Sequence, residues 1–175
     1  QHAAVNDLGV INAHFNKRTQ VKKYGGKYAN RAYRWQDNLR TKAVEKLFPN
    51  YFTGFKNLHA PAAYTKSAFA AVWDAEPELL ARTTSHRFRS AEDLNQWVCL
   101  WWQVASGQFA PFNTDNVVSC ADGDTVDELC RIIREQCHDM LCINDPEKPV
   151  DFEVLSAQLR CAFEMILPEK SEFER

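Results

Sequence analysis

The sequence lacks the patterns that identify several common classes of protein. It contains no glycine-rich phosphate-binding loop, no HExxH zinc motif and no GxSxG nucleophile motif. Internal repeats and low-complexity segments are also absent. The longest strongly apolar stretch, Trp97 to Ala105, is interrupted by Gln103 and is far too short to span a bilayer. We therefore expect a soluble or peripheral chain that belongs to none of these motif classes.

Net charge is also small, although the charges are unevenly distributed. The 21 Lys and Arg residues nearly balance the 23 Asp and Glu residues, which argues against a dedicated nucleic-acid binder and a polybasic membrane anchor. Residues 1–56 carry +8, residues 57–112 carry -1 and residues 113–175 carry -9. This order gives a basic N-terminal stretch that can face an anionic partner, followed by an acidic tail.

The chain has 175 residues, which suits one domain or a piece of a larger one, and a hydrophobic fraction of 45% is enough for a packed core. It also has six cysteines. The spacing of Cys130, Cys137, His138 and Cys142 matches no common structural zinc pattern. We expect reduced, mostly buried thiols in a cytosolic protein.

Hydrophobic periodicity predicts a chain that is predominantly helical. The expected helices cover residues 5–16, 35–48, 65–75, 90–105, 125–133 and 151–166, a further turn begins at Pro77, and the expected strands cover 117–118 and 140–143. Gly25 and Gly26 are expected to break any element between the first two helices. Strand, helix, strand and helix alternate after Phe112, so the predicted fold class is α/β with helices dominating.

The apolar face of the helix expected over 90–105 carries three tryptophans. Trp97, Trp101 and Trp102 lie within six residues of one another, and their helical spacing favours burial in the core. A sugar-stacking platform is the alternative for these rings. Exposure of Trp73, Trp97 or Trp101 would favour that alternative, and burial would count against it.

Two loops concentrate the polar groups that could perform chemistry. One is 57–61, which contains His59 and is followed by Lys66; the other is 83–89, which is followed by Asp93. Arginine suits bidentate contact with phosphate, and histidine can act as an acid or base near neutral pH. The loops are therefore candidates for phosphate handling, with capping residues and solvated arginines as the alternative.

Three stretches resemble the C-terminal half of the Stealth family of sugar-1-phosphate transferases, and the bacterial exopolysaccharide enzymes are the nearer likeness. They are GFKNLHAPAAYTKSAFAAVW, TTSHRFRSAEDLNQWVCLWWQVASGQFAP and MLCINDPEKPVDFEVLSAQLRCAFEMILPEKSEFE, and the likeness begins at VINAHFNKR. The resemblance implies one segment over 1–175, the C-terminal part of a Rossmann-like, glycosyltransferase-like catalytic domain. Within it, 1–56 would be a basic stretch, 57–112 the motif core and 113–175 an acidic α/β tail.

The family's functional residues fall on matching positions of this sequence. The resemblance implies that His59 is the active-site histidine, that Arg89 meets the phosphates of the nucleotide-sugar, and that Asp93 lies at the acidic position beside that arginine. Three more positions match the bacterial pattern and are expected to bind or support the substrate; they are Lys66, Arg87 and Asn95.

The resemblance also implies a reaction. A sugar hydroxyl would attack the β-phosphate of a nucleotide-sugar, release the nucleoside monophosphate and leave a phosphodiester in a capsular or exopolysaccharide. Such transfer depends on positioning and cationic neutralisation. His59 would either accept the hydroxyl proton or donate to a phosphate oxygen. A Mg²⁺ ion is implied as well, although no carboxylate cluster in the sequence is an obvious ligand set.

The sequence departs from the family pattern in one respect. The N-terminal blocks with the YTWVD-like motif are absent, and the first residue is Gln1. We therefore expect a fragment that lacks the N-terminal half of its domain, is inactive alone, and lies in the cytoplasm or at the inner face of the cell membrane. The alternatives are a non-catalytic carbohydrate-binding or scaffolding module and a glycosyltransferase without phosphate transfer.

Overall fold

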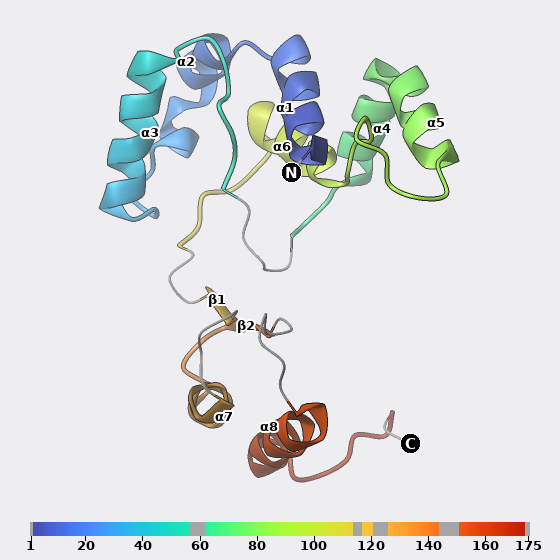
Figure 1. Ribbon diagram of the computed structural model, residues 1–175. Coiled ribbons are helices and arrows are strands. Elements are labelled where there is room, and N and C mark those ends of the chain that lie inside the picture. The colour runs from blue at the N-terminus through green and yellow to red at the C-terminus, as the bar shows by residue number, and fades with distance from the viewer. Residues whose placement is uncertain (1, 57–61, 114–116, 121–125, 144–150, 174–175) are drawn as a thin grey trace. The chain divides into compact units, whose positions relative to one another are not determined.

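The computed structural model describes residues 2–56, 62–113, 117–120, 126–143 and 151–173, with side chains undescribed in 117–120. The chain forms two compact units (Figure 1). Among the described residues, unit 1 comprises 2–56 and 62–113, and unit 2 comprises 117–120, 126–143 and 151–173. Unit 2 therefore falls within the acidic part of the sequence.

Helices make up most of the described chain. Unit 1 contains α1 (His2–His14), α2 (Lys17–Tyr28), α3 (Trp35–Leu47), α4 (Lys66–Ala75), α5 (Pro77–Ser85) and α6 (Trp97–Ala105). Unit 2 contains β1 (Val117–Cys120), α7 (Val126–Glu135), β2 (Met140–Ile143) and α8 (Phe152–Ile166). None of the helices in these described ranges is long and apolar enough to cross a membrane.

Several predicted helix starts are confirmed by the bonds that hold them. The Thr65 hydroxyl accepts the Ala68 N–H at 3.2 Å and caps α4. The Asp151 carboxylate accepts two N–H groups of the first turn of α8. Pro77 occupies the first turn of α5. A backbone N–H at this position has no acceptor within the helix, so proline loses no hydrogen bond there.

Two predicted boundaries are displaced. The break expected at Gly25 and Gly26 lies one residue earlier, at Tyr24, whose backbone departs from helical geometry, and the helical turns resume through Tyr28. The helix expected from Ser90 begins only at Trp97. The cause is visible in the intervening turn, where side chains rather than helical carbonyls accept the backbone N–H groups.

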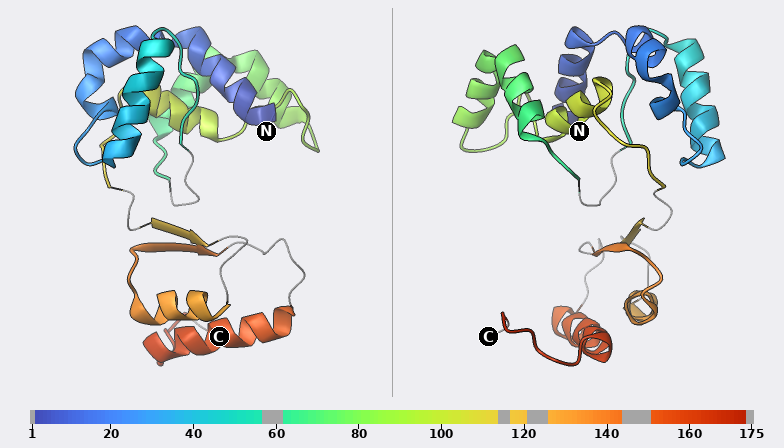
Figure 2. Two further views of the ribbon diagram at one scale, coloured as in Figure 1. Left: turned by 60° about the vertical axis from the view of Figure 1, so that its left-hand side comes forward. Right: turned by 180° about the vertical axis from the view of Figure 1, so that it is seen from behind.

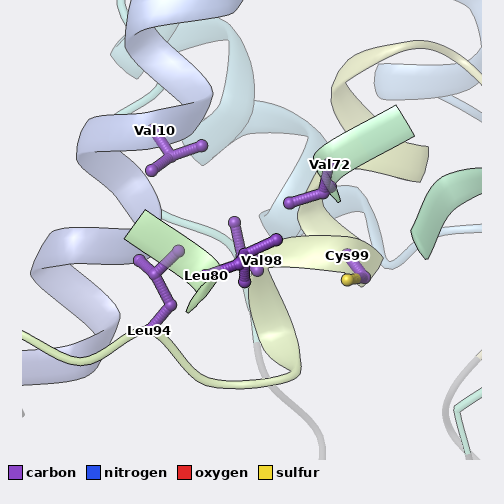
Figure 3. Close-up of a cluster of buried hydrophobic side chains, with 6 residues drawn as sticks. All are labelled: Val10, Val72, Leu80, Leu94, Val98 and Cys99. Carbon is purple, nitrogen blue, oxygen red and sulfur yellow. The ribbon is translucent and has the colours of Figure 1, made fainter. Parts of the chain in front are cut away.

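The core of unit 1 forms around α1 and α6, with α4 and α5 on one side and α2 and α3 on the other (Figures 1 and 2). One buried cluster brings together residues of α1, α4, α5, the turn before α6 and α6 itself (Figure 3); its members are Val10, Val72, Leu80, Leu94, Val98 and Cys99. A second cluster contains Ile11, Phe52 and Trp101. Trp101 is only 4% exposed, and Trp97 and Trp102 are partly buried against these clusters, so core packing is the observed role of these rings.

Unit 2 pairs its two strands in parallel, with Val117 opposite Met140 and Cys120 opposite Ile143. Helices α7 and α8 lie on the same side of the strand pair and pack against each other (Figure 2). Their contact buries Cys130, Ile133 and Ala162. The described chain is therefore predominantly helical, as predicted, and its strands are limited to this short pair.

Candidate active site

A cavity of about 610 Å³ in unit 1 collects most of the polar groups singled out in the sequence. Its polar wall is the segment between α5 and α6, which contributes His86, Arg87 and Arg89. Its aromatic wall is formed by α4, where Phe69 and Trp73 line the same cavity and are 39% and 41% exposed. The cavity thus combines cationic groups with open aromatic faces.

Within the cavity wall, His86 and Asp93 form a hydrogen-bonded pair. The Nδ1 atom of His86 lies 2.7 Å from Oδ1 of Asp93, and the other carboxylate oxygen of Asp93 accepts the Ser90 N–H at 2.6 Å. The Ser90 N–H and then the His86 ring hold the pKa of the Asp93 carboxyl below its usual range. A carboxylate at Nδ1 favours the imidazole form that carries its proton there and leaves Nε2 for a ligand.

Helix α1 anchors the segment that carries this pair. The buried Asp7 carboxylate accepts the Asn95 N–H at 3.1 Å, and the Asn6 side-chain amide donates to the Ala91 carbonyl at 2.8 Å and to the Asp93 carbonyl. Burial raises the pKa of Asp7 to about 7. Its Oδ2 atom has no hydrogen-bond partner among the described residues. The loop geometry therefore depends on a carboxyl group that is costly to ionise.

The two arginines of the cavity are exposed and remain available to a ligand. Arg87 lies over the Phe88 ring at 5.5 Å from the ring centre. The nearby Arg82 is already engaged with Glu92 at 3.6 Å. Within the described ranges, no acidic side chain forms an ion pair with Arg87 or Arg89. Two unpaired guanidinium groups at one cavity can bind a group with more than one negative charge.

The structure brings some of the predicted site residues together and leaves others apart. Arg87, Arg89, Asp93 and Asn95 all line the cavity. The Asn95 side chain accepts the N–H of Trp97, the first residue of α6, at 2.7 Å. Lys66 is exposed at the first position of α4 and is not among the residues that line the cavity.

His59 lies outside the described residues. The Asp93 side chain has two partners within its own segment. Its carboxylate contacts the His86 ring and the Ser90 N–H, and no bond joins it to Arg89 in the part of the chain that the structure describes.

His86 was not among the predicted site residues, although it belongs to a loop recognised as rich in anion-binding groups. Its side chain is 35% exposed, while that of Asp93 is 11% exposed, so the carboxylate is the more enclosed member of the pair. The signal in the sequence was a histidine seven residues before an acid. That spacing alone did not predict a contact, because the turn between His86 and Asp93 is what brings the two side chains together.

The described residues do not fit the Mg²⁺ ion that the family resemblance implies. No three His, Cys, Asp or Glu side chains come together within the ranges that the structure describes. Asp93, the one acid at the cavity, already has its two oxygens engaged by His86 and Ser90. We assign no metal ligand to this part of the chain.

Comparison with known proteins gives one consistent class of relative. The chain is 30% identical over 172 residues to the capsular polysaccharide phosphotransferase WcwK of Streptococcus pneumoniae, covering 97% of this chain and 50% of WcwK. It is 30% identical over 175 residues to the exopolysaccharide phosphotransferase cps2G of Lactiplantibacillus plantarum, covering 99% of this chain and 51% of cps2G. It is 28% identical over 173 residues to the receptor polysaccharide phosphotransferase WefC of Streptococcus gordonii, covering 99% and 51%.

These matches extend over nearly the whole chain, and the chain spans about half the length of the curated relatives it matches. No protein-family model matches it, and no solved structure shows a significant match. The chain is therefore a homologue of the bacterial capsular and exopolysaccharide phosphotransferases, as the resemblance of its motifs to the Stealth family predicted.

Proposed function

We propose that the chain forms part of the catalytic domain of a sugar-1-phosphate transferase. The domain moves a hexose-1-phosphate from a nucleotide-sugar to a sugar hydroxyl during capsule or exopolysaccharide synthesis. In this proposal the chain is one segment of a Rossmann-like, glycosyltransferase-like domain, and the remainder of the site comes from the other half that the relatives possess.

The observation that carries the proposal is the cavity of unit 1, with Arg87 and Arg89 on one wall and Trp73 on another. A nucleotide-sugar carries a diphosphate between two ring systems. Two guanidinium groups at one cavity suit the diphosphate, and an exposed aromatic side chain suits a sugar or base ring. The homology to polysaccharide phosphotransferases supports the same substrate class.

In the proposed reaction, the acceptor hydroxyl oxygen forms a bond to the β-phosphorus of the nucleotide-sugar. The bond from that phosphorus to the oxygen bridging the two phosphates breaks, and the nucleoside monophosphate leaves with the bond's electron pair. Arg87 and Arg89 neutralise charge on the phosphates as it shifts. The hydroxyl proton passes to His59, or His59 donates to a phosphate oxygen and another base accepts the proton.

His86 acts in this scheme through its fixed orientation. Asp93 holds Nδ1 of the ring, so Nε2 is the atom that can meet a phosphate oxygen or the acceptor hydroxyl. We include the Mg²⁺ ion in the proposal on the family resemblance alone, and no step above passes through it.

A chimera tests the proposal. This chain replaces the matching half of a WcwK phosphotransferase, and the purified chimera receives a nucleotide-sugar and an acceptor saccharide. We expect a phosphodiester product, seen by ³¹P NMR, and none from the 175-residue chain alone. In the chimera, Arg89→Ala should lower kcat/KM by about 100-fold or more, because one charge-stabilising group is lost.

Arg31→Ala is the matched control, since Arg31 is exposed and lies between α2 and α3, outside the cavity. It should leave kcat/KM within about twofold, as expected for an exposed substitution away from the site. Equal activity of the Arg89→Ala and Arg31→Ala chimeras would contradict the assignment of the cavity.

A non-catalytic carbohydrate-binding module is the second candidate, and the exposure of Trp73 and Phe69 favours it. If the chain binds carbohydrate only by ring stacking, Trp73→Ala should abolish its binding of a neutral oligosaccharide and Arg89→Ala should have no effect. A glycosyltransferase without phosphate transfer would give the chimera a glycosidic product that has no ³¹P signal. Either result would replace the proposal.

A further inference from the structure

The outward face of α3 combines exposed apolar side chains with basic ones. Trp35, Leu39 and Leu47 are 68%, 56% and 71% exposed, and Phe48, directly after the helix, is 51% exposed. The exposed charged residues of the same helix are Arg40, Lys42 and Lys46. We call these seven residues the α3 face.

The acids of α3 lie elsewhere on the helix. Asp37 and Glu45 are the only acids in α3, a helix described throughout, and both are half-buried. Asp37 forms an ion pair with Lys56 at 3.3 Å and lies 3.8 Å from Arg40, and Glu45 raises the pKa of Lys17 against the effect of burial. The exposed charges of the helix are therefore all positive, and α3 itself has no fully buried residue.

A groove of about 390 Å³ lies beside this face. It is lined by Arg18 from α2 and by Lys42, Glu45, Lys46 and Pro49. Within the described ranges, no ion pair engages Arg18, Lys42 or Lys46. Three cations with one carboxylate among them leave the groove net positive, and this suits an anionic group such as a lipid phosphate.

We propose that the α3 face is a docking surface for an anionic phospholipid membrane, with a lipid phosphate in the groove lined by Arg18, Lys42 and Lys46. Surfaces that bind at the membrane interface bring Lys and Arg together with Trp, Phe and Leu side chains that enter the boundary of the acyl chains, and the α3 face intermixes both kinds of side chain. A soluble anionic polymer would satisfy the cations but would leave Leu39, Leu47 and Phe48 in water. The combination of charge and apolar exposure selects the lipid surface.

The position of α3 in unit 1 is compatible with this role. Figures 1 and 2 show α2 and α3 on the opposite side of α1 and α6 from α4 and α5. The cavity with Arg87 and Arg89 is lined from α4 and the segment before α6. Docking through α3 therefore leaves that cavity open. The proposed membrane surface does not depend on the proposed sugar-phosphate transfer.

The test is flotation of the full 175-residue chain with lipid vesicles. We expect the chain to float with vesicles of phosphatidylcholine mixed with phosphatidylglycerol and to stay behind with pure phosphatidylcholine. Lys42→Gln/Lys46→Gln should weaken binding to the mixed vesicles about fivefold for each residue, or about 25-fold for the pair. Leu39→Gln/Leu47→Gln should weaken it about tenfold or more through the lost apolar contact.

Unit 2 offers matched controls. Arg134→Gln/Arg160→Gln removes the same charge from exposed positions of α7 and α8, and Met165→Gln/Leu167→Gln removes apolar groups that are 65% and 66% exposed. Both pairs should bind the mixed vesicles as the parent does. All the substituted side chains are exposed, so circular dichroism should show an unchanged fold.

Three outcomes would overturn the proposal. They are no flotation with the mixed vesicles, equal loss in the unit 2 controls, and binding that the α3 variants leave unchanged. Sedimentation tests a second copy of the chain as another occupant of this face. A dimer that Leu39→Gln/Leu47→Gln dissociates, in a chain that does not float with vesicles, would assign the face to a second copy instead.

Discussion

Unit 1 and unit 2 bury their apolar side chains to different extents. Ile11 and Val72 of unit 1 are completely enclosed, whereas the last helix of unit 2 has one buried residue, Ala162. That helix leaves Phe152 74% exposed, and Phe173 beyond it is 86% exposed. The difference indicates that unit 1 has a closed core around α1, α4 and α6, although its α3 face is exposed, while α8 of unit 2 leaves several large apolar side chains exposed.

The same contrast extends to polar groups. Unit 1 encloses Asp7 and uses its carboxylate to hold the segment that carries Asp93 and His86. In unit 2 the strong polar interactions that are described lie at the surface, as in the ion pairs of Arg131 with Glu128 and Glu135. A closed core can position functional groups precisely, and this is why the candidate site belongs to unit 1.

The largest expected effect is a pH dependence of the free energy of unfolding that belongs to unit 1. Burial raises the pKa of Asp7 from 3.8 to about 7, so folding retains a proton that the unfolded chain has lost. Between about pH 4 and pH 7 the free energy of unfolding of unit 1 should fall by about 4 kcal/mol in all, with no further contribution from Asp7 above pH 7. Urea unfolding measured across this range should show that Asp7→Asn lacks this loss.

Asp74→Asn is the control for that experiment, because Asp74 is an exposed acid of α4 in the same unit. Its pH profile should follow that of the parent chain. If Asp7→Asn and Asp74→Asn gave the same profile, the enclosed carboxylate would not be the source of the pH dependence.

A pair of core substitutions tests whether the units unfold independently. Ile11→Ala removes a fully enclosed side chain from unit 1 and should cost it about 3 kcal/mol, and Ile133→Ala, at a site 4% exposed, should cost unit 2 about 2 kcal/mol. Hydrogen exchange should show each loss in the unit that carries the change. Lost protection in both units from either substitution would show that the two units unfold together.

The smallest effect comes from the two helix caps. Thr65→Ala removes the cap of α4 and one partner of the buried Gln103, and should cost unit 1 about 1.5 kcal/mol. Asp151→Ala removes only an exposed cap of α8 and should cost unit 2 about 1 kcal/mol. Thermal unfolding of these variants against Thr65→Ser and Asp151→Asn measures both. A larger cost at Asp151 than at Thr65 would show that the contact with Gln103 adds nothing to the Thr65 cap.

The sequence was most informative where periodicity and caps agreed. The helix after Thr65 and the helix after Asp151 begin where their capping residues predicted, and Trp101 is buried as its helical spacing required. These features are local, because a cap bonds the next few N–H groups and a helical stripe repeats every three or four residues. These features form without contacts from residues that are distant in the sequence.

Prediction failed where a distant residue decided the local structure. Ser90 resembled a helix cap, but the Asn95 N–H bonds Asp7 from 88 residues away, and the helix starts later. The pairing of His86 with Asp93 depends on that same turn. The family resemblance supplied Arg87 and Arg89 as candidates, and only the fold placed both of them in one cavity.

The most direct test of the account is an NMR titration of the ¹⁵N-labelled chain with uridine diphosphate. We expect shifts for His86, Arg87 and Arg89 in unit 1, no shifts in α7 or α8, and an increase in Kd of about tenfold or more for Arg89→Ala, because a charge-assisted contact is lost. Shifts confined to unit 2, or a Kd that Arg89→Ala leaves unchanged, would contradict the claim that the cavity of unit 1 binds the phosphates.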